Sequence, residues 1–191
     1  MEIQRTMEAR RKARIDRLAG LAHVGARRAA DAFAQLVGRA IRVEAPVVIE
    51  QGSLWTGPSE GGSTGVLFEF EGCLDAIVAI LFPAPSSERL VRRIVGIERD
   101  PLEPPLIESA LMEVGNILAS HVASAIADTL GERLLPSIPA LAMESAEETF
   151  GAWIDERVGP EALRIESRLH DDPLELRGRL VLIPTRGSLG D

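Results

Sequence analysis

Apolar residues in the segment Leu106–Gly131 return at intervals of three and four positions, at Ile107, Leu111, Val114, Leu118, Val122, Ile126 and Leu130. This period predicts an amphipathic helix with one buried stripe. Polar residues return at the same intervals but lie off that stripe, at Ser109, Glu113, Asn116, Ser120 and Ser124. Because residues three apart are neighbours on a helix, Glu113 and Asn116 are predicted to project side by side, where an outside molecule could meet both.

Elsewhere the same kind of patterning predicts a second long helix and several strands. The helix is expected at Met7–Gly38. Period-two alternation at Val66–Glu71, followed by the apolar run Ala76–Phe82, predicts a hairpin whose second strand is covered on both faces. The other expected elements are a Gly/Ser-rich loop at Gln51–Ser63, short helices from Ser86 or Ser87 to Ile97 and at Ala146–Val158, and strands at Ile41–Ile49, Leu134–Met143, Leu163–Leu169 and Leu176–Ile183.

Polar residues within these elements are expected to face water or to cap helix ends. Arg164, Glu166 and Arg168 alternate with apolar residues, so the sequence predicts that they form the exposed face of their strand. Ser109 follows a pair of prolines, and capping the long helix is the expected use of its hydroxyl group.

A shift of 93 positions aligns the first long helix with the second without a gap. Leu18 and Gly38 then lie over Leu111 and Gly131, and the other matches are Ala26, Ala30, Ala32, Ala34 and Pro46 over Ala119, Ala123, Ala125, Ala127 and Pro139. A glycine that can end each helix and a proline eight residues later are harder to obtain by chance than alanine matches. The sequence therefore predicts one domain, 1–191, with half-repeats at 7–99 and 100–191.

Composition and charge narrow the classes of function. Hydrophobic residues make up 46% of the 191 residues, which is enough for a full core. The net charge of −8 argues against a nucleic-acid partner, which requires a basic face. No membrane insertion and no secretory signal are expected, so the protein is predicted to be cytoplasmic. Because Cys73 stands alone and the three histidines are scattered, no metal or cofactor held by this chain is expected.

Positive charge gathers at the start of the chain, at Arg5, Arg10, Arg11, Lys12, Arg14 and Arg17. The simplest interpretation of this run is a solvated extension of the first helix. The alternative is a surface that contacts a partner.

The motif Ser109-x-x-x-Glu113-x-x-Asn116, followed after twenty-two residues by Pro139, resembles that of the CheC/CheX/FliY phosphatases of bacterial and archaeal chemotaxis. The family pattern has Asp or Ser, then Glu, then Asn, then a distant Pro. The context GNILAS around Asn116 also fits, and the similarity, greatest to CheC, covers nearly the whole chain.

The resemblance implies an α/β (α+β) fold with pseudo-two-fold symmetry, in which two long helices pack on a shared, largely antiparallel β-sheet. CheC proteins can carry two active sites, one in each half. In the first half of this chain the motif positions are Asp16, Gly20, His23 and Pro46, so glycine and histidine replace the Glu and the Asn. The chain is therefore expected to keep one working site, in its second half.

The resemblance also implies a substrate, which is the phosphoaspartate of a CheY-like response regulator whose Mg²⁺ is held by the regulator itself. Asn116 is expected to orient the attacking water, because a carboxamide positions but has no useful basicity. Glu113 is expected to pair with the active-site lysine of the regulator. Ser109 could also contact the regulator's backbone, and Pro139 is expected to be structural.

A second partner is implied by the apolar edge of the short helix at Ala146–Val158, which consists of Phe150, Trp153 and Ile154. These residues are either core residues or, as in CheC relatives, part of a docking surface for the receptor deamidase CheD.

Three functions remain open on this basis. The first is an enzyme with one phosphatase site. The second is a non-catalytic adaptor that binds a phosphorylated regulator or CheD, which the degenerate first site makes credible. The third is a component of a flagellar switch, since switch proteins share this fold, although they usually add a terminal domain that this chain is expected to lack.

Overall fold

The computed structural model describes residues 1–50, 62–98, 100–160, 162–173 and 175–185. Most of the expected Gly/Ser-rich loop, 51–61, lies outside the described residues. The described strands form one antiparallel eight-stranded sheet. Its main order is β1 (Arg42–Val43), β7 (Arg164–His170), β8 (Arg177–Pro184), β4 (Ala76–Pro83), β3 (Ser63–Gly72) and β5 (Leu134–Pro136), while β2 (Val47–Ile49) pairs with β7 and β6 (Ala140–Ala142) pairs with β3.

The two halves of the chain exchange edge strands in this sheet. β1 and β2, from the first half, pair with β7 of the second, whereas β5 and β6, from the second half, pair with β3 of the first. β4 and β8 meet at the centre. Neither half therefore has a complete sheet of its own, and the boundary between half-repeats at 99 and 100 stays a prediction.

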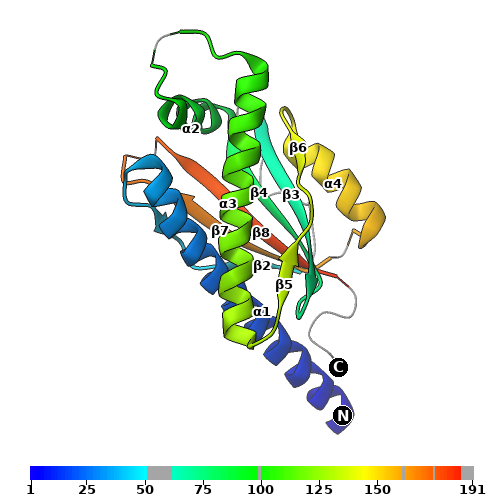
Figure 1. Ribbon diagram of the computed structural model, residues 1–191. Helices are drawn as coiled ribbons and strands as arrows, with labels where there is room; N and C mark the ends of the chain where they lie inside the picture. The colour runs from blue at the N-terminus through cyan, green and yellow to red at the C-terminus, as the bar shows by residue number, and fades with distance from the viewer. Residues whose placement is uncertain (51–61, 99, 161, 174, 186–191) are drawn as a thin grey trace.

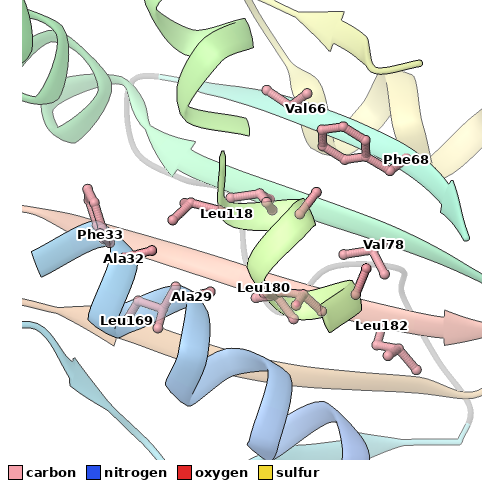
Figure 2. Packing of buried hydrophobic residues seen from close by; sticks show 14 of the residues in the cluster. Ala29, Ala32, Phe33, Val66, Phe68, Val78, Leu118, Leu169, Leu180 and Leu182 are labelled. Carbon is pink, nitrogen blue, oxygen red and sulfur yellow. The ribbon is translucent and has the colours of Figure 1, made fainter. Parts of the chain in front are cut away.

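The long helices α1 (Glu2–Val37) and α3 (Pro104–Leu130) cover one face of the sheet and run in roughly opposite directions across it, with the shorter α2 (Ala84–Val95) beside them (Figure 1). Figure 2 shows part of the core between the helices and the sheet, with Phe33 of α1 and Leu118 of α3 in the same cluster as Phe68 and Leu180 of the strands. The helix α4 (Ala146–Arg157) packs on the opposite face, where Phe150 and Ile154 join a smaller apolar cluster.

The central strands are buried on both sides. Along β4, Val78 and Ile80 face the larger cluster under α1 and α3, whereas Ile77 and Leu81 face α4. The hairpin of β3 and β4 and the burial of its second strand are confirmed.

By length and composition alone, α3 could cross a membrane. Half of its most apolar stretch is buried inside the fold, against α1 and the sheet. Because the core helix of a soluble fold passes the same test, this is weak evidence for insertion.

Most predicted elements are confirmed, but the first helix begins at Glu2 rather than Met7. Residues 1–14 of the chain are exposed, as expected for a solvated extension. Two capping predictions are wrong. Ser86 and Ser87 lie inside the first turn of α2, where their hydroxyl groups donate to the carbonyls of Glu175 and Ala84. Because Pro104 already starts α3 without a side-chain cap, Ser109 lies in the second turn and caps nothing.

The prediction that β7 exposes its charged face to water is also wrong. Arg164 and Glu166 are 2% and 3% exposed, and only Arg168 of the three reaches solvent. Glu166 pairs with Arg168 at 3.3 Å and approaches Arg179 of β8 at 3.8 Å. Alternation shows which residues share a face, but opposite charges on neighbouring elements allow a charged face to be buried.

Candidate functional site

The candidate site is the outer face of α3. Ser109, Glu113, Asn116, Ser120 and Ser124 are all exposed, while the apolar stripe of the same helix is buried. The prediction that Glu113 and Asn116 share an exposed face is therefore confirmed. Their roles in chemistry are not tested by this placement.

The side chains of Glu113 and Asn116 have no partner within the described part of the chain. No hydrogen bond or ion pair ties either group to a neighbouring element, so the carboxylate and the carboxamide are both available to an outside molecule. A carboxamide offers one acceptor oxygen and two N–H donors, and an ionised carboxylate only accepts. Side by side, the two groups suit a partner that presents a cation next to a hydrogen-bonding group or a water molecule.

Gly115 lies on the buried side of α3, directly behind the exposed site residues. It is buried between the two site residues, and a Cβ built on it would come within 2.9 Å of the side chain of Val66 on β3. The backbone of α3 therefore lies directly on the sheet at the point where the site residues project. A helix that contacts an internal strand of the sheet in this way is a rigid support for a binding site.

The second helix fixes α3 from the side. Gly25 of α1 is also buried, and a Cβ on it would come within 2.9 Å of Val122 on α3. Both helices end at a glycine in the left-handed conformation, Gly38 with φ 64° and Gly131 with φ 71°. The prediction that these glycines end the helices is confirmed. Their left-handed conformation determines the direction in which the chain leaves each helix.

Pro139 lies in the break between β5 and β6 and is partly buried. Ser137 maintains the pairing with β3 across this break. Its N–H donates to the carbonyl of Glu69 at 2.7 Å, and its hydroxyl group accepts from the Glu69 N–H at 2.9 Å. The break leaves Ile138 90% exposed. Sequence analysis noted the proline but not this exposed isoleucine, which has no periodic signal because it lies outside the strands.

The corresponding positions in the first half lie on α1 and its following strands. Asp16 and Gly20 are exposed, and a Cβ at Gly20 would meet nothing within 4 Å. His23 is partly buried, with its Nδ1 enclosed and without a hydrogen-bond partner. Pro46 is partly buried between β1 and β2. This face lacks both the carboxylate and the carboxamide of its counterpart.

A groove of about 180 Å³ lies on the other side of the molecule, between α4 and the β5–β6 edge. Its apolar lining includes Leu67, Ile138, Phe150 and Trp153. Phe150 is 4% exposed and belongs to the core, whereas Trp153 is partly exposed and stacks under the guanidinium of Arg157 at 4.9 Å.

Two carboxyl groups, those of Asp171 and Asp172, have depressed pKa values. Both lie at the turn after β7, far along the chain from Glu113 and Asn116. Burial alone would raise the pKa of Asp171, but hydrogen bonds from the Leu176 N–H and from Arg39, both 3.0 Å long, outweigh it and hold that pKa below its ordinary value. A hydrogen bond from Arg42 lowers the pKa of Asp172. These two carboxyl groups are not part of the candidate site.

The comparisons with known proteins agree with the resemblance seen in the sequence. The model of the CheC-like family matches residues 106–142, a segment that contains Glu113, Asn116 and Pro139. The CheY-P phosphatase CheC of Bacillus subtilis (strain 168) is 28% identical over 191 residues, covering 91% of this chain and 89% of that protein.

Solved structures show the same fold. FliY of Thermotoga maritima aligns with a TM-score of 0.68 at 14% identity, covering 91% of this chain and 90% of that one. CheX from Borrelia burgdorferi, in a complex with CheY, BeF₃ and Mg²⁺, aligns with a TM-score of 0.62 at 11% identity, covering 86% and 97%. The predicted fold class, two long helices packed on one largely antiparallel sheet, is confirmed.

Proposed function

We propose that the chain is a member of the CheC-like family, whose model matches residues 106–142, and that it is a phosphatase of chemotaxis that hydrolyses the phosphoaspartate of a CheY-like response regulator. The observation that carries the proposal is the pair Glu113 and Asn116, exposed and without internal partners on a helix packed against the sheet. The CheY-P phosphatase CheC of Bacillus subtilis is similar to this chain over 91% of its length, and the structure of Borrelia burgdorferi CheX was solved with CheY bound.

Hydrolysis of an acyl phosphate requires a water molecule held in line with the phosphorus atom and the leaving carboxylate. Asn116 supplies this position by entering the regulator's phosphorylation site and hydrogen-bonding the water. It removes no proton, since a carboxamide is not a useful base at neutral pH. Its contribution is orientation, which is effective only if the amide is held rigidly. The close contact of neighbouring Gly115 with Val66 supports this requirement.

Glu113 fixes the docked pose. Its exposed carboxylate pairs with the active-site lysine of the regulator through a charge-assisted hydrogen bond. The Mg²⁺ that neutralises the phosphoryl charge belongs to the regulator. Ser109, one turn before Glu113 and with no capping role, is free to contact the regulator's backbone.

One half of the molecule performs the reaction in this proposal. Gly20 and His23 stand where Glu113 and Asn116 stand in the second half. A glycine offers no carboxylate, and the imidazole of His23 presents its polar atoms in a geometry different from that of a carboxamide. The first helix therefore contributes packing and binding rather than hydrolysis.

We also propose that CheD docks on the side of α4. The groove there is lined by two large apolar side chains, the exposed Ile138 and the partly exposed Trp153 of α4. An exposed apolar groove of this kind is typical of a protein docking site. Phe150 and Ile154, which the sequence placed on the same edge, are buried in the core and support the groove from below.

The test is phosphate release from a phosphorylated CheY-like regulator of the same organism, with Mg²⁺ present. Wild-type protein is expected to accelerate release, and Asn116→Ala is expected to abolish the acceleration while the protein remains folded by circular dichroism. Ser124→Ala is the matched control, because Ser124 lies on the same exposed face two turns away. Equal activity of wild type and Asn116→Ala would remove the role given to Asn116. Binding of the regulator without any acceleration would favour the adaptor function.

A further inference from the structure

The two long helices carry opposite charges on their solvent-exposed sides. α3 has no lysine or arginine, and its exposed charged residues are Glu108, Glu113 and Asp128. α1, by contrast, exposes Arg27 and Arg28 in the part that packs beside α3. A partner that docks on the outer face of α3 and extends sideways therefore meets positive charge on the neighbouring helix.

Arg27 and Arg28 line a groove of about 310 Å³ between the two helices. Its other walls are formed by Val24 and Asp31 of α1 and by Ala125, Asp128 and Thr129 of α3. Asp31 and Asp128 are close enough to share the groove. Even so, neither guanidinium group forms a hydrogen bond or ion pair with any residue that the structure describes. Both guanidinium groups are thus free to bind an anionic group from outside.

We propose that Arg27 and Arg28 form the cationic part of the docking surface for the phosphorylated regulator, and that they contact carboxylates on its surface outside the phosphorylation site. This inference rests on the phosphatase function proposed above. Carboxylates are the protein side chains that pair with a guanidinium group through charge-assisted hydrogen bonds.

The distances suit one docked protein. Asn116 and Ala125 are nine residues apart on α3, which corresponds to about 14 Å along the helix axis. A regulator of roughly 100 residues has a radius of gyration of about 13 Å, so it covers both positions at once. The separation is too large for the arginines to touch the phosphoryl group held at Asn116. Their role is binding and orientation of the regulator.

The alignment of the two halves supports the same assignment. Arg27 occupies the position of Ser120, one turn after the residue that corresponds to Asn116. The face of the first half that carries Gly20 and His23 thus exposes an arginine one turn further on, and Gly25 packs this part of α1 closely against Val122 of α3. Exposed charges at the rim of an interface mainly raise the association rate and set its salt dependence.

The experiment measures binding and phosphate release with one regulator. Its phosphorylation site is loaded with beryllofluoride and Mg²⁺ for binding, and phosphorylated for release. Arg27→Glu/Arg28→Glu is expected to weaken binding about tenfold at low salt, with most of the loss in the association rate, and to lose this difference as salt is added. Arg27→Lys/Arg28→Lys keeps the charge and is expected to bind within about twofold of wild type.

The matched control is Arg5→Glu/Arg10→Glu, which makes the same change of charge on the same helix. These residues lie in the extension of α1 that leaves the fold at the bottom of Figure 1, roughly 25 Å beyond Arg27 along the axis. That distance exceeds the Debye length of about 8 Å at physiological salt, so this control is expected to bind within about twofold of wild type.

The outcomes separate the two proposals. Hydrolysis by wild type with unchanged binding by Arg27→Glu/Arg28→Glu would overturn this inference alone. If the Arg5 and Arg10 control weakened regulator binding equally, the inference would also be overturned. The positive charge of α1 as a whole, and not these two arginines, would then be responsible. If wild type neither binds nor dephosphorylates the regulator, both proposals are wrong.

Discussion

Gly115 on α3 lies against Val66 on β3, so closely that a Cβ on the glycine would come within 2.9 Å of the valine side chain. Val66 is 1% exposed and belongs to the core beneath both long helices. A β-branched side chain has little freedom to move aside. This contact therefore sets the height of α3 above the sheet, and with it the positions of Glu113 and Asn116.

A methyl group at this position tests the relationship. Gly115→Ala gains about 1 kcal/mol of helix propensity, but overpacking at a rigid neighbour costs about 1–3 kcal/mol. We expect a net loss of stability of up to about 2 kcal/mol, together with lower phosphatase activity, measured by urea unfolding and phosphate release. The control is Gly20→Ala, at an exposed helical position with nothing within 4 Å, which is expected to gain about 1 kcal/mol. Equal gains in both variants would show that the contact does not restrain α3.

The sequence pattern located the two long helices, the hairpin and the polar face of α3, because periodicity reports which side of an element is buried. It could not show how close the buried side comes to its neighbour. Gly115 had no special signal in the sequence, although its lack of a side chain lets α3 touch the sheet.

Other features escaped the sequence because they depend on partners distant along the chain. Arg164 and Glu166 look like surface residues in an alternating strand and are buried, since charged groups from β8 and α4 lie nearby. In the sequence, Arg27 and Arg28 are two basic residues on a predicted helix. Their position at the edge of a groove depends on the packing of α1 against α3, which the sequence pattern does not show. The roles of Glu113 and Asn116 rest on family resemblance, which geometry alone does not supply.

The acid sensitivity of the fold is expected to depend on Asp171. Its carboxyl group is 1% exposed and its folded-state pKa is depressed, so its contribution to stability is present above the ordinary aspartate pKa of about 3.9 and is lost as pH falls through the folded value. Asp171→Asn is therefore expected to lower stability at pH 7 and to reduce the further loss between pH 7 and pH 3. Urea midpoints at both pH values measure this.

Asp172→Asn is the control for that measurement. Asp172 pairs with Arg42 at a site where both side chains are more than 60% exposed, and solvent screens such a pair. Its removal is expected to change the urea midpoints little at either pH. An effect as large as that of Asp171→Asn would indicate that the whole turn, rather than the buried carboxylate, sets the acid response.

The degenerate half-site offers a test of whether residue identity or surroundings decide activity. The open space around Gly20 accepts a glutamate side chain, and replacing His23 removes an imidazole whose Nδ1 is enclosed without a partner. In an Asn116→Ala background, Gly20→Glu/His23→Asn is therefore expected to restore a measurable part of the wild-type rate of phosphate release. The matched control is Gly20→Glu/His23→Ala, which has the carboxylate but no carboxamide and is expected to stay inactive. If the Asn variant is folded but also inactive, then the surroundings of the first half, including the basic pair at Arg27 and Arg28, prevent a productive pose even when the two side chains are present.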